Sequence, residues 1–488
     1  MKTTYFKLIL PLIILALASC GDSFLDKKPL GKLTTANFFE TENHAILATN
    51  ALYEHMRSWE VHVFSYIGMT DIVSDDADKG SFANDAAFLG EIDDFTFSAS
   101  NLAPLTVWQG YYQGIFRANN AIVNIPGIAM NTALRDRLVA ECKVFRAYFY
   151  LNLVRWFGDV PLITEPLDPS EFSQPRVPVT DVYHQIEQDL LDAIAVLPEK
   201  SQYTSAELGR VTRGSARGLL ARAYLAQGDF VNTEKYALEV INSSQYSLYP
   251  NYAKIFQLVG EHSSESVFEI GSTTGAINSS QYNQVQGARG TPNLGWGFNR
   301  PSDNLVSSYE QGDPRRDATI LYPGETLPDG SAVVEDNPDI VNERYNQKAW
   351  VPPAPSGDNF EGQGNLRLIR YADVLLMAAE ALNENNNPTQ ALVYLNMVRT
   401  RARGTSMTVL PNVTTTDKNA LRIRIWNERR SELAMEQIRW FDLLRQGRAE
   451  QVMQAVGKNF VSPKHLLFPI PQVEIDLSSG DLEQNPGY

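Results

Sequence analysis

Two tracts of the sequence combine flat aromatic side chains with hydrogen-bonding ones. The candidate ligand-binding residues are Trp59, Asp71, Asp75 and Phe82 in residues 59–100, and Tyr282, Arg289, Trp296, Asn299 and Trp350 in residues 260–363. A flat ring covers an apolar ligand face at little cost in entropy, while carboxylate, amide and guanidinium groups meet hydroxyls. These two tracts are therefore the candidate ligand-binding parts of the chain.

The stretch SDDADKG, residues 74–80, clusters three carboxylates. Calcium needs several oxygen ligands, and the spacing lacks the twelve-residue loop with a closing glutamate that many calcium sites use. We therefore interpret the stretch as a solvated polar loop. Binding of ligand hydroxyls is the main alternative, a calcium ion is a minor one, and no other metal or cofactor is expected.

Enzymatic motifs are absent from the sequence. It contains no G-x-S-x-G elbow, no GK[ST] phosphate loop and no H-E-x-x-H zinc motif. Its 57 acidic residues make any pair of carboxylates uninformative about glycoside hydrolysis. We predict that the protein is not an enzyme, and that His55 and His62 are surface or packing residues.

The elements that must position these tracts are helices. Residues 133–163 carry apolar side chains at helical spacing, and Gly158 and Pro161 should end the helix. Residues 212–244 and 366–403 each suggest two helices joined by a short turn, at 227–229 and 385–387, with Pro388 opening the last helix. One further helix is expected over residues 420–447, and ESVFEIG suggests a strand.

Residues 144–162 are rich in aromatic side chains, and at this helical spacing we expect most of them to form core. The charges of ERRSEL and RWFDL, residues 428–433 and 439–443, are expected to form ion pairs that fix helix packing. Contact with a partner protein is the alternative for these charges.

The N-terminus has the pattern of an export signal. Met1–Lys7 is basic, residues 8–18 are apolar, and small residues lead to Cys20. The apolar run is about half the length needed to cross a bilayer. The run Leu17-Ala18-Ser19-Cys20 resembles the lipobox of bacterial lipoproteins, which implies removal of residues 1–19 and acylation of Cys20. An ordinary signal peptide is the alternative.

Composition narrows the choice of partners. The formal net charge is −15, which argues against nucleic acid as a partner because phosphate binding needs a basic surface. With Cys20 acylated, Cys142 has no disulfide partner, and its apolar surroundings indicate a buried position.

Several segments, taken in order, resemble the SusD/RagB family of Bacteroidetes outer-membrane lipoproteins. They include FLDKKP after the lipobox, VWQGYYQGIFRANNAI, KVFRAYFYLNLVRWFGDVPL, VTRGSARGLLARAYLAQGDF, NLGWGFNRPSDNL, LIRYADVLLMAAEALNE, NERRSELAMEQIRWFDLLRQG and the closing LFPIPQVEIDL. The resemblance covers nearly the whole chain. It implies a mainly α fold, a tetratricopeptide-like solenoid of helix pairs with an irregular loop-rich part that carries a few short strands.

The resemblance also implies an organisation and a function. Residues 1–19 are the signal peptide, 20–230 the N-terminal region, and 231–488 the C-terminal region with the loop-rich insert 260–363. The protein would be lipid-anchored on the outer face of the outer membrane and pass an oligosaccharide to a TonB-dependent, SusC-like transporter. A peptide ligand and a purely protein-binding helical scaffold are the alternatives.

Within this family resemblance, Trp296 and Asn299 lie in a shared stretch, which favours a scaffold role for them. Trp59, Tyr282 and Trp350 lie outside the shared motifs, where ligand specificity should vary. We therefore expect these three rings to form the binding platform.

Overall fold

The computed structural model describes residues 38–275, 279–289, 295–340, 343–352 and 362–488, and these are mainly helical. Cys20 and the predicted signal peptide lie outside the described residues, as does Phe360 of the second aromatic tract. No helix among the described residues is both long enough and apolar enough to span a membrane.

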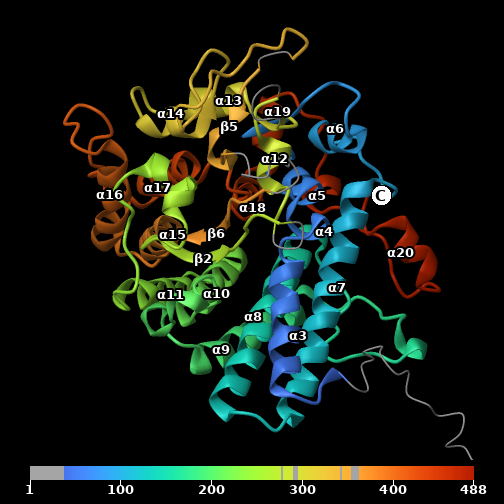
Figure 1. The fold of residues 1–488 in the computed structure, drawn as a ribbon. Coiled ribbons are helices and arrows are strands. Elements are labelled where there is room, and N and C mark those ends of the chain that lie inside the picture. The colour runs from blue at the N-terminus through green and yellow to red at the C-terminus, as the bar shows by residue number, and fades with distance from the viewer. Residues whose placement is uncertain (1–37, 276–278, 290–294, 341–342, 353–361) are drawn as a thin grey trace, which may run out of the picture.

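Long helices form a continuous stack through the molecule (Figure 1). The helix α7 packs on α8, α8 on α9, α9 on α10, α10 on α11, α11 on α15, and α15 on α16 and α17, while α3 lies across α7 and α8. The bounds of these helices are α3 Glu42–His55, α7 Leu102–Asn124, α8 Thr132–Phe157, α9 Val179–Val196, α10 Arg213–Gln227, α11 Phe230–Asn242, α15 Tyr371–Glu384, α16 Pro388–Arg403 and α17 Lys418–Leu433. This arrangement confirms the predicted fold class.

The predicted helix pairs are confirmed with their turns. Gly228 adopts a left-handed conformation after α10, and the Asp229 side chain caps α11 by accepting from the Asn232 amide. Pro388 is the first residue of α16, where its missing N–H costs nothing. The turn at residues 385–387 thus separates two helices that pack against each other.

Shorter elements form an irregular layer beside the stack, at the top of Figure 1. Its helices, together with those of the C-terminal segment, are α4 Trp59–His62, α5 Phe64–Ile67, a π-helical turn Gly68–Ile72, α6 Ala87–Asp93, α12 Tyr282–Gln286, α13 Asp303–Ser308, α14 Pro314–Thr319, α18 Arg439–Arg445, α19 Ala449–Ala455 and α20 Gln472–Leu477. Among the described residues, the loop-rich insert therefore contains ordered elements.

Within the described segments, three two-stranded antiparallel sheets tie distant parts of the chain together. The pairs are β1 Ala77–Gly80 with β3 Phe298–Pro301, β2 Ser266–Ile270 with β6 Leu366–Arg370, and β4 Ile320–Leu321 with β5 Tyr345–Asn346. The strand expected in ESVFEIG is β2. The β1–β3 pair matters most for the site, because it places residues 77–85 beside Arg289 and residues 295–301.

The aromatic segment of α8 is core, as predicted. Phe145, Phe149 and Trp156 are fully buried, and the helix ends at Gly158, whose positive φ breaks the helical path. Cys142 is also buried and free. His55 and His62 are buried packing residues rather than surface ones. One hydrophobic cluster runs from Ala45 to Leu482, so the chain before and after residue 230 shares a core.

The single helix expected over residues 420–447 is wrong, because the chain breaks between α17 and α18. Met435 and Gln437 adopt positive φ values. The Gln437 amide donates to Asp71 at 3.0 Å, and the buried Lys348 ammonium donates to the Ala434 carbonyl at 2.8 Å. These contacts with other parts of the chain replace the helical hydrogen bonds that residues 434–438 would otherwise make.

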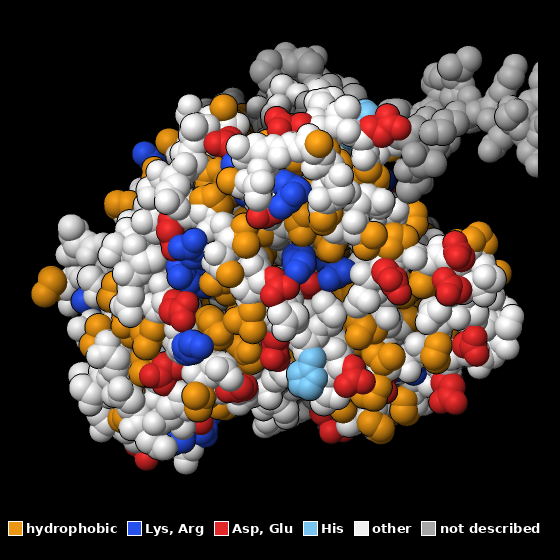
Figure 2. Space-filling model, turned by 90° about the horizontal axis from the view of Figure 1, so that it is seen from below, with side chains coloured by type: hydrophobic (Ala, Val, Ile, Leu, Met, Phe, Trp, Pro, Cys, Tyr) orange, Lys and Arg blue, Asp and Glu red, His pale blue; other side chains and the backbone are white. Residues whose placement is uncertain are grey.

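The charge distribution agrees with the acidic composition on the face seen in Figure 2. Acidic and basic side chains are interspersed there among hydrophobic ones, without a broad basic area. This face therefore does not offer the basic footprint that nucleic-acid binding requires.

Candidate functional site

Four of the predicted residues come together on the irregular layer. Trp59, Phe82, Arg289 and Trp296 are all half-buried, so each presents part of its side chain to solvent. The rings of Trp59 and Trp296 lie 6.1 Å apart between centroids, and the Arg289 guanidinium lies 3.9 Å from the centre of the Phe82 ring. We refer to these four residues as the aromatic surface.

The aromatic surface is supported from below. The buried ring of Phe64 packs edge-on against Trp59, with centroids 4.9 Å apart, and at 5.6 Å from Trp296. The Trp296 amide donates to the Gln284 carbonyl at 3.0 Å. Both tryptophans are thus held by packing and backbone contacts, which reduces the entropy that a ligand would have to remove.

Arg289 is fixed in place by residues from both tracts. Its Nη1 donates to the Ser81 hydroxyl at 2.6 Å, to the Trp296 carbonyl at 3.0 Å and to Asp85 at 3.2 Å. The β1–β3 pair permits these contacts. At Gly80 a Cβ would lie 2.4 Å from the Gly297 carbonyl oxygen, so only glycine allows the two strands to approach this closely here.

Sequence reasoning missed two polar residues beside the aromatic surface. Lys79 donates to the carbonyls of Phe82 and Asp85 at 2.6 and 2.8 Å, which orders the loop that carries Phe82. The Asp85 carboxylate is 40% exposed, and the hydrogen bond from the Ser81 hydroxyl and then the Arg289 guanidinium lower its pKa. The available signal was the short polar run KGSFAND, residues 79–85, which begins in β1 and continues into the following loop.

Asp71, Asn299 and Tyr282 are corrections, because the structure buries all three. Asn299 Nδ2 donates to Asp71 at 2.9 Å, and Tyr282 donates to the Gln437 side chain at 3.0 Å. Burial raises the pKa of Asp71 to about 6, against the lowering effect of its hydrogen bonds. These residues form a polar network beneath the surface and are too enclosed to touch a ligand in this conformation.

Asp75 is likewise a correction, and so is the expected solvated loop at 74–80. The Asp75 carboxylate accepts two hydrogen bonds from Arg439, at 2.8 and 2.9 Å, and lies 2.9 Å from Arg430. Asp76 accepts from Arg430 at 2.7 Å. Both carboxylates are buried and occupied by arginines. No group of three or more potential metal ligands forms among the residues that the structure places.

Trp350 is the last correction. Its side chain is 3% exposed and packs with Ala288, Leu321 and Tyr345 in a satellite core of the insert. The expected platform of Trp59, Tyr282 and Trp350 therefore does not exist in this structure. Instead, Trp296, for which a scaffold role was favoured, is half-exposed beside Trp59.

The predicted ion pairs of the C-terminal helices are confirmed. Arg429 pairs with Asp373 at 2.8 Å and with Asp442 at 2.9 Å. Glu432 contacts Arg315, Arg370 and Arg401, and these arginines lower its pKa to about 2 although burial opposes the shift. The charges of ERRSEL and RWFDL thus connect helices inside the molecule.

The fold is a stack of helix pairs, and the irregular layer beside it carries the half-buried aromatic surface. Together these features define a helical-repeat protein with a candidate ligand-binding face. A family model described as "SusD family" matches residues 254–488, and one described as "Starch-binding associating with outer membrane" matches residues 23–225. "SusD-like protein P2" of Formosa agariphila is 30% identical over 521 residues, covering 99% of each chain. The chain belongs to the SusD family.

Solved structures share the fold. A "Laminarin binding SusD-like protein" is 31% identical with a TM-score of 0.79, covering 92% of this chain and 100% of that one. "Surface glycan-binding protein A" from Bacteroides thetaiotaomicron, in complex with laminarihexaose, is 25% identical with a TM-score of 0.76, covering 91% of this chain and 99% of that one. The names of both neighbours describe binding and no reaction.

Proposed function

We propose that this protein binds an oligosaccharide on the aromatic surface without altering it. The observation that carries the proposal is the pairing of two half-exposed tryptophans, Trp59 and Trp296, brought together from segments more than 200 residues apart. Their faces suit the C–H faces of sugar rings, while Arg289 and Asp85 offer a donor and an acceptor to hydroxyls. The glycan-binding names of the solved relatives support this choice over a peptide ligand.

The proposal also covers the location of the protein in the cell and its partner protein. Cys20 would carry the lipid that holds the protein at the outer membrane, consistent with the family description. Several acyl chains on one residue anchor firmly, since each buried CH₂ contributes about 0.8 kcal/mol. From that position the protein would hand its ligand to a SusC-like, TonB-dependent transporter. No catalytic step is required.

Binding is tested first with laminarin and laminarihexaose, the ligands that the names of the relatives supply, and then with a polysaccharide and peptide panel. The chain beginning at residue 21 is titrated by calorimetry. Trp59→Ala and Trp296→Ala should each weaken binding about tenfold, because losing a stacking ring costs on the order of 1 kcal/mol.

Phe172→Ala serves as the matched control, because Phe172 is 66% exposed and belongs to the loop before α9. It should bind as the unaltered protein does. If the variant that combines Trp59→Ala with Trp296→Ala binds glycan as well as the unaltered protein does, the aromatic surface is not the binding site. Binding of peptides but of no glycan would support the alternative ligand, and release of reducing ends would contradict the non-enzymatic role.

The anchor has its own test. Cells fed labelled palmitate should label the full-length protein but not Cys20→Ala, because acylation needs the thiol. A labelled Cys20→Ala protein, or an unlabelled native protein, would refute lipid attachment at this position.

A further inference from the structure

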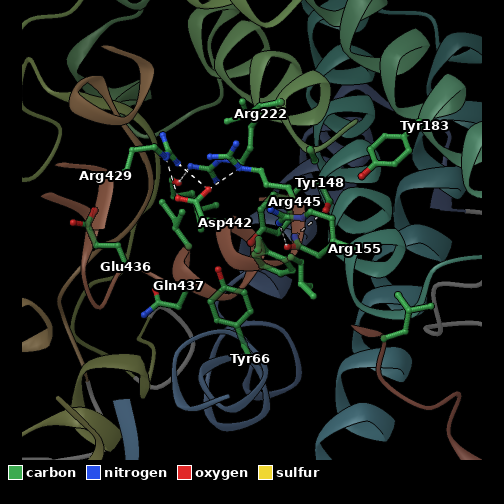
Figure 3. Close-up of a pocket in the computed structure, with 18 of the residues that line it drawn as sticks. Tyr66, Tyr148, Arg155, Tyr183, Arg222, Arg429, Glu436, Gln437, Asp442 and Arg445 are labelled. Atoms are coloured by element: carbon green, nitrogen blue, oxygen red, sulfur yellow. Dashed lines mark hydrogen bonds and ion pairs between the residues drawn. The ribbon is translucent and has the colours of Figure 1, made fainter. Parts of the chain in front are cut away.

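A cavity lies between α8, α10 and α18, and it shares no residue with the aromatic surface (Figure 3). Its volume is about 320 Å³, at the small end of the range for ligand sites in proteins. Three tyrosines, Tyr66, Tyr148 and Tyr183, contribute to its walls, together with leucines from α10 and from the C-terminal segment. A molecule of about the size of one sugar ring or one amino acid would fill it.

Most charges around the cavity are already balanced. Arg222 pairs with Asp373 at 2.7 Å, and Arg429 pairs with Asp373 and Asp442. Arg445 pairs with Asp442 and Glu380, at 2.8 and 2.6 Å. These three arginines and three carboxylates form a closed set, so none of them leaves a charge for a ligand to neutralise.

Arg155 is different. No carboxylate lies within 4 Å of its guanidinium among the residues that the structure describes. Its Nε donates to the Leu151 carbonyl at 3.1 Å and its Nη2 to the Asn152 side chain at 2.6 Å, while the group stacks 3.6 Å from the Phe441 ring centre. Within the placed part of the chain, Nη1 makes no hydrogen bond. A positive charge therefore faces the cavity without a counter-charge.

The surroundings make that charge costly. Burial, and then the neighbouring Arg222 guanidinium, lower the pKa of Arg155 to about 10. Arg155 is half-buried and still reached by water, and an anion in the cavity would offset part of its desolvation. An anionic ligand in the cavity would supply the missing partner.

Tyr183 adds an independent observation. The residue is 7% exposed, and its hydroxyl forms no hydrogen bond with the rest of the described chain. In Figure 3 this hydroxyl points toward the side of the cavity that holds Tyr148 and Arg155. The hydroxyl oxygen is still reached by solvent, so it is available to donate to a molecule that enters the cavity.

We propose that this cavity binds a small organic carboxylate, with Arg155 as its charge partner and Tyr183 as a hydrogen-bond donor. The carboxylate could come from a sugar acid or from an amino acid, since both fit the volume and both can pack on tyrosine and leucine side chains. The inference stands apart from the glycan surface and does not depend on it.

The test titrates the chain beginning at residue 21 with four probes, followed by calorimetry and by thermal shift. D-glucuronate is compared with neutral D-glucose, and N-acetyl-L-phenylalanine with its amide. At least one acid should bind and raise the melting temperature, and its neutral counterpart should bind at least tenfold more weakly. Which acid binds identifies the source of the carboxylate. If neither acid binds at millimolar concentration, the proposal is refuted.

Two variants assign the residues. Arg155→Met keeps most of the bulk over Phe441 and should weaken acid binding at least tenfold, while Tyr183→Phe should weaken it several-fold. Arg135→Met, at the exposed start of α8, should have no effect. Acid binding that survives both Arg155→Met and Tyr183→Phe would place the acid elsewhere and overturn the assignment.

If Arg155→Met does not fold, Tyr183→Phe decides alone. The variant Trp59→Ala/Trp296→Ala should bind the acid normally, so this site can fail or succeed independently of the proposed oligosaccharide surface.

Discussion

At the residue scale, the buried charges show what a sequence reveals and what it hides. The run ERRSEL predicted ion pairs correctly, because several charges on an otherwise apolar helix need partners. Their partners could not be predicted: Glu432 meets Arg315, Arg370 and Arg401, which come from three other elements. The prediction that Asp75 binds ligand was wrong for the same reason. Its arginines lie more than 350 residues away, and a polar run in a loop looks solvated without them.

Glu432 should make the protein sensitive to acid. Its folded-state pKa is about 2, below the ordinary value, so its contribution to stability is complete above about pH 4.5 and is lost as the pH falls toward 2. A shift of this size corresponds to about 3 kcal/mol. Denaturant unfolding between pH 7 and 3 should therefore show a falling free energy of unfolding at the acid end.

The variant Glu432→Gln distinguishes the contribution of Glu432 to acid sensitivity from that of the other carboxylates. The variant should unfold about 3 kcal/mol more easily at pH 7, because three buried arginines lose a partner, and should lose less on acidification. Glu450→Gln, on an exposed position of α19, should behave like the unaltered protein. An acid profile of Glu432→Gln parallel to that of the unaltered protein would contradict the assignment.

At the element scale, regular helices were predictable and irregular segments were not. The helical spacing of apolar residues correctly predicted that α8 is buried, and it predicted both helix pairs with their turns. Loops have no regular spacing from which buried and exposed positions could be predicted. For this reason Tyr282 and Trp350 were predicted to contact ligand although they are buried, whereas Trp296 was assigned to the scaffold although it is only half-buried. The break between α17 and α18 was also hidden, because it depends on Asp71 and Lys348 from elsewhere in the chain.

The contact between α7 and α8 provides a test of helix packing. At Gly114 an added Cβ would lie 2.5 Å from the Phe149 ring, so Gly114→Ala must push the helices apart. We expect a loss of about 1–3 kcal/mol, measured by denaturant unfolding.

Gly127→Ala is the matched control, because a Cβ there would meet nothing within 4 Å. It should change stability by less than about 0.5 kcal/mol. Equal stability of the two variants would show that α7 and α8 tolerate a wider separation than this structure has.

At the scale of the whole molecule, the two regions expected on either side of residue 230 share one core and many ion pairs. The boundary also falls inside the α10–α11 pair. We expect residues 38–230 and 231–488, expressed separately, to be sensitive to protease and to lack a cooperative melting transition. Each alone would expose apolar surface and leave Asp71, Asp75 or their partners unmatched.

Mixing the two fragments should restore protease resistance if the shared core is what stabilises them. Circular dichroism during heating provides the second measurement. A fragment that melts cooperatively by itself would show that the boundary separates independent domains.

The bonds from Asp75 and Asp76 to Arg430 and Arg439 have a consequence for how the protein matures. Synthesis proceeds from the N-terminus, so these carboxylates leave the ribosome hundreds of residues before their arginines do. The ion pairs of Asp75 and Asp76 therefore cannot form until nearly all of the chain has been synthesised. If the protein is exported as proposed above, a chain that lacks these ion pairs would still be incompletely folded when it crosses the inner membrane, and a premature stop before residue 430 would leave Asp75 and Asp76 without their arginines.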